Sequence, residues 1–217
     1  KIIAQLNGGI AQLAKNRKVT VLCGEASFLS NKELLVKSQK GNEKIKFQNC
    51  IIASGSSSSM IPNVPQSHPS ILTSKTALDL DTVPKSLLII GGGIIGLELG
   101  QVYNTLGSSV SVVEFMPSLI PGADDDIVKP LIRKLKKNFT SIMLSSKVTK
   151  VVPLEGGGVK VSIENKGEMI EHTYEKVLVA VGRKPNTKGL NLEKVGIELD
   201  EKNRVKTDKN FKTSQSN

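Results

Sequence analysis

The chain has 217 residues, 38% of them hydrophobic, and carries 30 Lys and Arg against 20 Asp and Glu. This length allows one large domain or two small ones, and the Gly-rich turns with many β-branched residues indicate an α/β protein. The basic residues are scattered and no aromatic residues interleave with them, so no nucleic-acid partner is expected. The apolar stretch 87–97 is far shorter than the ~20 residues of a membrane span, so no membrane partner is expected either.

The first part of the chain has a helical pattern followed by strand-like patterns. Residues 1–17 carry five apolar side chains on a helical period, which predicts a helix: Ile2, Ile3, Leu6, Ile10 and Leu13. Three strands are predicted after it, at 19–22, 33–38 and 44–53, with a polar turn at 40–42. The last strand runs into Ser54-Gly55-Ser56, a small-residue turn where backbone amides can face a phosphate or a ring.

The cysteines and histidines form no recognisable site. Cys23 and Cys50 are far apart in sequence, which fits a reducing compartment, and each is interpreted as a small buried apolar residue. His68 and His172 lie in polar segments without metal-ligand spacing and are interpreted as surface residues. No metal site is therefore predicted.

A serine- and proline-rich segment, 56–70, separates these elements from the next motif. Such composition is typical of a linker or a long surface crossing. We therefore predict a domain boundary near residue 83, just before the next apolar strand.

The stretch 86–114 organises the chain, because it has the pattern of strand, glycine turn, helix and second strand. The apolar run 87–90 is typical of a buried parallel strand. It leads into Gly91-Gly92-Gly93-Ile94-Ile95-Gly96, which fits G-x-G-x-x-G. A helix is predicted from this turn to Leu106, with Gly107 ending it, and a second strand at 110–113.

Each part of this stretch suits the binding of a dinucleotide. Gly91 permits the tight turn, Gly93 lets a pyrophosphate approach the backbone, and Gly96 lets the helix pack close to the strands. The pyrophosphate would lie at the positive N-terminus of the helix. Glu114 ends the second strand, where it can accept hydrogen bonds from the adenosine ribose. Because residues 115–117 include no cation, this end favours NAD over NADP; the alternative is a plain βαβ turn without a ligand.

The second half of the chain continues the α/β pattern. Asp124-Asp125-Asp126 is interpreted as the start of a helix rather than as a metal site. The predicted strands that follow are 140–144, the three strands of a meander at 147–154, 159–164 and 169–174, and a buried strand at 177–181. The expected fold is therefore a Rossmann-like parallel sheet with helices plus a β-meander.

Five segments together carry a family resemblance. They are GGIAQLAKNRKV near the start, IIASGS at 51–56, IIGGGIIGLELG at 89–100, SVVE at 111–114 and VAVGRKPNT at 179–187. The glycine motif alone would fit many oxidoreductases, but the five in this order are specific to the disulfide-reductase flavoproteins. Over essentially its whole length the chain resembles the dihydrolipoamide dehydrogenases, a branch of the pyridine nucleotide-disulfide oxidoreductase family.

The resemblance implies two cofactors, FAD and NAD, and an NAD domain inserted into an FAD domain. Residues 1–82 would then be the C-terminal half of the FAD-binding domain plus a linker. Residues 83–202 would be the NAD-binding domain, and 203–217 would begin the return to the FAD domain. The family's redox cysteine pair and its His–Glu acid/base pair have no counterpart in this sequence. We therefore expect a piece lacking both ends, inactive by itself.

The resemblance also assigns site residues. On the NAD side they are Gly91, Gly92, Gly93, Ile94, Ile95, Gly96, Leu97, Glu98, Glu114, Val148 and Gly182. On the FAD side they are Ala26, Ser54, Gly55 and Ser56. The sequence departs from the family pattern here, because Ser54 stands where Thr or Ala is usual. Glu98 matches a glutamate near the contact of flavin and nicotinamide, and its alternative interpretation is a solvent-facing helix residue.

The implied activity of the intact protein is NAD-dependent dihydrolipoyl dehydrogenase, an enzyme that oxidises dihydrolipoamide. The implied partners are the lipoyl domain of a 2-oxo acid dehydrogenase complex and a second copy in a homodimer. The implied location is the bacterial cytoplasm, or the mitochondrial matrix in a eukaryote. Two alternatives stay open: a sister reductase of the mercuric or glutathione type, and an isolated nucleotide-binding module without activity.

Overall fold

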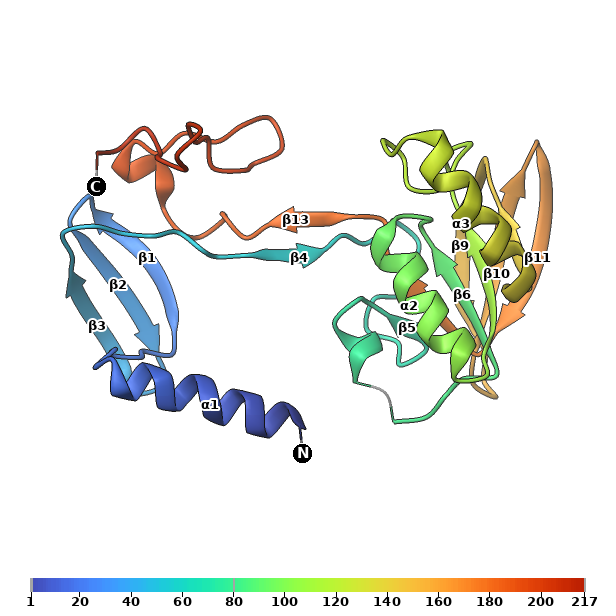
Figure 1. Ribbon diagram of the computed structural model, residues 1–217, viewed down its shortest axis with the longest axis horizontal. Helices are drawn as coiled ribbons and strands as arrows, with labels where there is room; N and C mark the ends of the chain where they lie inside the picture. Colours follow the sequence, from blue (N-terminus) through green and yellow to red (C-terminus); the bar gives the residue numbers. More distant parts are fainter. Residues whose placement is uncertain (1, 80, 217) are drawn as a thin grey trace. The chain divides into compact units, whose positions relative to one another are not determined.

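The computed structural model describes residues 2–79 and 81–216, which form two compact units (Figure 1). The central unit is Ser56–Lys184, and the split unit combines Lys1–Gly55 with Pro185–Asn217. The central unit therefore begins well before the domain boundary expected at 83, and it ends before the one expected at 202. The reason is packing: β5 (Ile71–Leu72) pairs with β12 (Lys176–Val179), and Val64 is buried in the central core. Which cofactor each domain serves stays a prediction.

The central unit is built on a five-stranded sheet in the order β5-β12-β6-β7-β8. All neighbouring strands in it are parallel. Strands β6 (Ser86–Ile90), β7 (Ser109–Val113) and β8 (Ser141–Met143) are joined by helices α2 (Ile94–Thr105) and α3 (Asp125–Asn138). The predicted strands, both helices and the helix-ending Gly107, at φ +111°, are confirmed. The chain is thus an α/β protein with the expected parallel sheet.

Both faces of this sheet are covered, because successive residues of each strand point to opposite sides. Leu87 and Ile89 of β6 pack with residues of the two helices, such as Leu97 and Leu135. Leu88 and Ile90 instead pack in a second cluster with the meander. Burial on both faces explains why the strands are continuous apolar runs rather than alternating ones.

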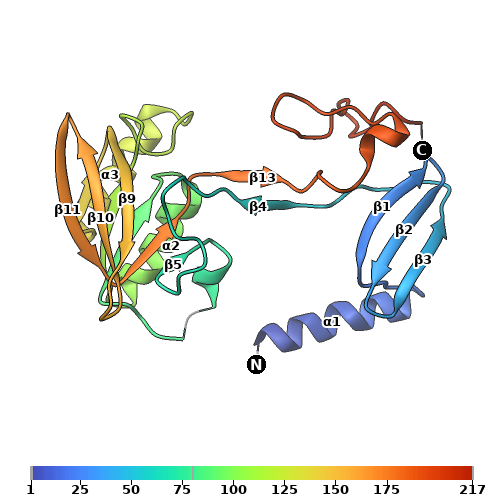
Figure 2. The ribbon, with the colours of Figure 1, turned by 180° about the vertical axis from the view of Figure 1, so that it is seen from behind.

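The meander is the predicted antiparallel sheet, in the order β11-β10-β9 (Figures 1 and 2). Its strands are β9 (Ser146–Pro153), β10 (Val159–Asn165) and β11 (Glu168–Tyr174). Val159, Val161 and Ile163 are fully buried while their neighbours face outward, as the alternating pattern predicts. Short elements complete the central part: η1 (Thr76–Leu78), and β4 (Ser56–Ser58) paired with β13 (Arg183–Pro185).

The split unit contains helix α1 (Ile2–Asn16) and an antiparallel sheet of β1 (Glu25–Ser30), β2 (Glu33–Ser38) and β3 (Gly41–Lys46). Its small core joins Phe28 of β1 to Leu192, Val195 and Ile197, in and just after the short helix η2 (Leu192–Val195). The N-terminal helix is confirmed, but α1 has no buried residue. No helix in the described ranges has the length and apolar character that a membrane crossing requires.

Three predictions for the split unit are wrong in whole or part. Residues 19–22 form no strand, and the strand expected at 44–53 ends at Lys46. A strand needs a neighbour to satisfy its backbone groups, and no strand of the described chain pairs with either segment. Cys23 is exposed rather than buried, since it lies in this unpaired stretch. Cys50 is half-buried, and burial raises the pKa of its thiol.

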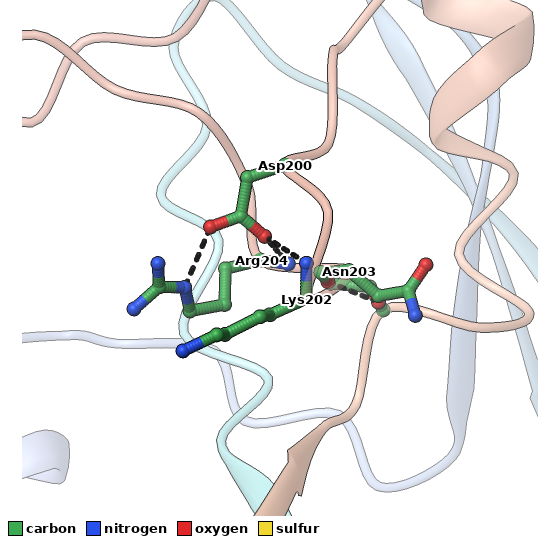
Figure 3. Close-up of polar contacts among 5 residues, drawn as sticks. Asp200, Lys202, Asn203 and Arg204 are labelled. Atoms are coloured by element: carbon green, nitrogen blue, oxygen red, sulfur yellow. Dashed lines mark hydrogen bonds and ion pairs between the residues drawn. The ribbon is translucent and has the colours of Figure 1, made fainter.

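After η2 the chain makes two turns of the same construction. Asp200 accepts hydrogen bonds from the backbone N–H groups of Lys202 and Arg204, both at 2.9 Å, and from Arg204 Nε at 2.7 Å (Figure 3). Asp208 likewise accepts from the N–H groups of Asn210, at 2.8 Å, and Lys212, at 2.9 Å. These bonds hold the pKa of both carboxyl groups below the ordinary value. The carboxylates therefore stabilise turns that carry no regular secondary structure.

Candidate nucleotide-binding site

A cavity of about 1070 Å³ in the central unit lies at the carboxyl ends of β6, β7 and β12. In the sheet, β12 and β5 lie on one side of β6, while β7 and β8 lie on the other. The chain runs from β6 through β7 to β8 on one side and then returns, by way of the meander, to β12 on the other side. Ligands of open α/β sheets bind at the carboxyl ends of the strands, at such a switch point.

The turn after β6 is glycine because the surrounding backbone leaves no room. Gly91 has φ +110°, and a Cβ on it would lie 2.5 Å from the carbonyl oxygen of Ala180. A Cβ on Gly96 would meet the carbonyl oxygen of Gly91 even more closely. These two glycines are therefore required by the tight turn and by the close packing of α2, as the sequence predicts.

Gly93 differs from both of these glycines. It is the N-cap of α2, with φ −79°, and a Cβ on it would meet no protein atom within 4 Å. No side chain caps the helix here, and the first N–H groups of an α-helix have no acceptor within the helix. Gly93 also lines the cavity. The backbone at the positive end of α2 is thus open to an anionic group in the cavity.

Glu114 links the glycine turn to the loop after β7. It is only 7% exposed. Its Oε2 accepts a hydrogen bond of 2.6 Å from Gly92 N–H, and its Oε1 accepts one of 2.7 Å from Met116 N–H. An ionised carboxylate has about four acceptor positions, so two stay available for hydroxyl groups in the cavity. The sequence analysis placed Glu114 at the strand end but did not predict its hydrogen bond with Gly92 of the glycine turn.

The structure brings most of the residues assigned to NAD to one place. Those lining the cavity are Gly91, Gly93, Ile94, Ile95, Glu114, Val148 and Gly182. Gly92, Gly96 and Leu97 are buried and do not line it. Glu98 is exposed on α2 and is not part of the lining. Its role beside a flavin stays a prediction.

The residues assigned to FAD do not line the cavity at the glycine turn in the described part of the chain. Ala26, Ser54 and Gly55 are exposed in the split unit, and Ser56 belongs to the central unit. The carbonyl oxygens of Ser54 and Gly55 each accept a hydrogen bond of 3.0 Å from Asn186. Their assignment to a flavin rests on the resemblance alone.

The cavity lining includes two cations, Lys147 and Arg183, that the sequence analysis did not identify as site residues. Arg183 directly follows Gly182, and its guanidinium donates to Ser56 Oγ at 2.7 Å, to the carbonyl oxygen of Ser56 and to Ser74 Oγ at 3.2 Å. Lys147 directly precedes Val148. Adjacency to two assigned residues was the only signal in the sequence for either cation. Among the described residues, no group of three or more His, Cys, Asp or Glu could hold a metal ion.

The fold and the glycine turn define a class of α/β proteins with a Rossmann-like nucleotide site, and comparison with known proteins identifies the family. The model of the pyridine nucleotide-disulphide oxidoreductase family matches residues 1–217, so the chain belongs to that family. It is 44% identical over 214 residues to the dihydrolipoyl dehydrogenase of Haemophilus influenzae. It is 40% identical over 216 residues to the mitochondrial dihydrolipoyl dehydrogenase of Schizosaccharomyces pombe.

Solved structures of similar fold include a flavoprotein disulfide reductase. The HOCl-induced flavoprotein disulfide reductase RclA from Escherichia coli matches with a TM-score of 0.82 and 28% identity, over 96% of this chain and 46% of that one. LpdA from Mycobacterium tuberculosis matches with a TM-score of 0.84 and 25% identity, over 95% of this chain and 46% of that one. The curated relatives are likewise longer. The match takes in 98% of this chain but 44% of the Haemophilus protein and 42% of the Schizosaccharomyces protein.

Proposed function

We propose that the cavity binds NAD(H), with the pyrophosphate at the N-terminus of α2 and the adenosine ribose against Glu114. The chain then supplies NAD binding and part of FAD binding to a dihydrolipoyl dehydrogenase. Such an enzyme oxidises dihydrolipoamide and reduces NAD, and the two cofactors supply the hydride chemistry when bound. The protein's own share at this site is to bind the nucleotide and orient it.

The observation that carries the proposal is the empty space above Gly93. Gly91 and Gly96 are glycine because other backbone atoms crowd them, but nothing in the protein crowds a Cβ on Gly93. Its φ of −79° and ψ of 178° are open to any residue. A glycine there is explained by a ligand that must approach the backbone closely, at a helix N-terminus suited to phosphate.

The lipoamide branch is favoured over a sister reductase by the degree of similarity. Identity reaches 44% with dihydrolipoyl dehydrogenases, against 28% with the disulfide reductase RclA. The proposed partners of the whole protein are the lipoyl domain of a 2-oxo acid dehydrogenase complex and a second copy of the protein. The proposed location is the bacterial cytoplasm or, in a eukaryote, the mitochondrial matrix.

Calorimetric titration of the 217-residue chain with NAD tests the site. We expect wild type to bind NAD and Gly93→Ala to bind it at least ~10-fold more weakly, since a methyl group forced into a filled site costs about 1–3 kcal/mol. Gly156→Ala is the matched control, because a Cβ there also meets no atom within 4 Å and the residue does not line the cavity. Equal affinity of wild type and Gly93→Ala would show that the pyrophosphate does not lie at this turn.

The same titration with NADP tests Glu114. A 2′-phosphate would bring negative charge against the carboxylate and forfeit hydrogen bonds worth about 1.5–3 kcal/mol. NADP should therefore bind wild type at least ~10-fold more weakly than NAD. Glu114→Ala should reduce this preference, with Glu114→Gln as the variant that keeps the shape of the side chain. If both variants keep the wild-type preference for NAD over NADP, Glu114 does not determine that preference.

A further inference from the structure

Lys147 and Arg183, the two cations of the cavity lining, differ in how they are held. The guanidinium of Arg183 is fixed by Ser56 and Ser74. In the described part of the chain, no recorded hydrogen bond or ion pair engages the Lys147 ammonium group. Its partner across the meander is Glu164 of β10, yet the two side chains form no ion pair. Lys147 therefore lines the cavity as a cation that has no ion-pair partner among the described residues.

The backbone next to Lys147 runs directly beside Glu114. Glu114 N–H donates to the carbonyl oxygen of Met143 at 2.8 Å, and Ser146 N–H donates to the carbonyl oxygen of Glu114 at 2.9 Å. These bonds extend the parallel pairing of β7 with β8 beyond the ends of both strands. Because Lys147 is the next residue and lines the same cavity, a cation and an anion lie at one end of it.

The order of the strands shows which end this is. Arg183 follows β12, the N-terminus of α2 follows β6, Glu114 follows β7, and Lys147 comes shortly after β8. Neighbouring strands are about 4.8 Å apart, so β12 and β8 are separated by roughly 14 Å. The phosphate position at α2 lies between them. On the orientation proposed above, Lys147 is at the adenosine end.

We propose that Lys147 is a specificity-determining residue of the adenosine end, acting against Glu114. Its ammonium group attracts a phosphate at the 2′ position of the ribose, while the Glu114 carboxylate repels it. The preference for NAD over NADP then depends on two opposing effects on NADP affinity, repulsion by Glu114 and attraction by Lys147, and not on Glu114 alone. This inference rests on the proposed binding of NAD(H) in the cavity.

The test is titration of the full 217-residue chain with NAD and NADP in four forms: wild type, Lys147→Gln, Glu114→Gln and the double variant. A charge-assisted bond from an exposed ammonium group is partly screened by salt, so Lys147→Gln should weaken NADP binding about threefold to tenfold. NAD binding should change by less than about twofold, since NAD carries no 2′-phosphate. When Lys147→Gln is added to Glu114→Gln, it should weaken NADP binding at least as much as it does in the wild-type background.

Lys150→Gln is the matched control, because Lys150 is exposed on the same strand β9 and does not line the cavity. It should leave the NADP to NAD ratio unchanged. The inference is overturned if Lys147→Gln leaves the ratio of NADP to NAD affinity unchanged, or if Lys150→Gln changes that ratio equally. In either case, NAD binding by wild type would still support the proposed function. If wild type binds neither nucleotide, the proposed function and the inference both fail.

Discussion

The central unit and the split unit differ in how they bury apolar side chains. Leu87, Leu88 and Ile89 of the central sheet are 0% exposed. In the split unit the five large apolar side chains of α1 are 60–75% exposed, and Ile51 is 92% exposed. Both units come from equally regular apolar patterns. The difference lies in the partners, since the described chain supplies a layer for each face of the central sheet but nothing that covers α1.

This contrast shows what a periodic pattern can and cannot predict. A helical period predicts which residues share one face, but burial of that face also requires a second element to pack against it. The same holds for strands, whose hydrogen bonds need a neighbour. Residues 19–22 and 47–53 are apolar enough for strands and remain unpaired, whereas β12 lies between β5 and β6.

The difference between the two units should also appear in cofactor binding, and this is the largest effect that we expect. The 217-residue chain should bind NAD but should not retain FAD through gel filtration, because the resemblance assigns only part of the FAD site to it and the assigned residues Ala26, Ser54 and Gly55 are exposed. It should also show no dihydrolipoamide oxidation above the blank, because its two cysteines, Cys23 and Cys50, are not a redox pair. A yellow fraction with stoichiometric FAD, or turnover that persists after removal of contaminating enzyme, would contradict this.

A pair of leucine substitutions should reproduce the contrast in stability. Leu87→Ala in the central core should lower the free energy of unfolding by about 2–5 kcal/mol, since it leaves a cavity. Leu6→Ala in α1 should change it by less than about 0.5 kcal/mol, because Leu6 is 63% exposed. The chain has no Trp, and both tyrosines, Tyr103 and Tyr174, are in the central unit. Tyrosine fluorescence during urea unfolding therefore follows the central unit, and far-UV circular dichroism also follows α1 and the sheet of the split unit. A loss of stability from Leu6→Ala in the circular dichroism signal as large as that from Leu87→Ala would break the comparison.

The exposed face of α1 should be measurable with a hydrophobic dye. Exposed apolar patches favour association and dye binding, so the double variant Leu6→Gln, Ile10→Gln should lower ANS fluorescence by at least about twofold. Ile127→Gln is the control, because Ile127 is a comparably exposed apolar residue, at 69%, on a helix of the central unit. If the control lowers the signal as much as the double variant, α1 is not the main apolar surface.

The smallest effect expected is a pH dependence of the two aspartate turns in the split unit. The pKa values of Asp200 and Asp208 are lowered in the folded chain, mainly by backbone hydrogen bonds. Their stabilisation is therefore present above the ordinary pKa of 3.8 and is lost as the pH falls through the lower folded value. Hydrogen exchange at the amides of Lys202, Arg204, Asn210 and Lys212 should accelerate in that range. Asp208→Asn should remove the pH dependence at Asn210 and Lys212 only; its persistence there would show another cause.

The sequence alone determined the central sheet and the chemistry of its glycine turn. The runs at 87–90, 110–113 and 177–179 are buried on both faces, so their apolar pattern identified them without further information. The roles of Gly91 and Gly96 followed from the motif, because the positive φ of Gly91 and the contact of Gly96 with the carbonyl oxygen of Gly91 are local to the turn. The crowding of Gly91 by Ala180 comes from a distant segment. The alternation at Val159, Val161 and Ile163 fixed the meander in the same way.

Only the tertiary structure decided the features that depend on distant contacts. It bound residues 56–79 to the central unit through the pairing of β5 with β12, and it left Cys23 and α1 exposed. It also placed Lys147 beside Glu114, a residue 33 positions away, although the only signal for this in the sequence was that Lys147 precedes Val148. Local spacing predicts local conformation, but burial, charge pairing and the far wall of a cavity come from segments that meet only when the chain folds.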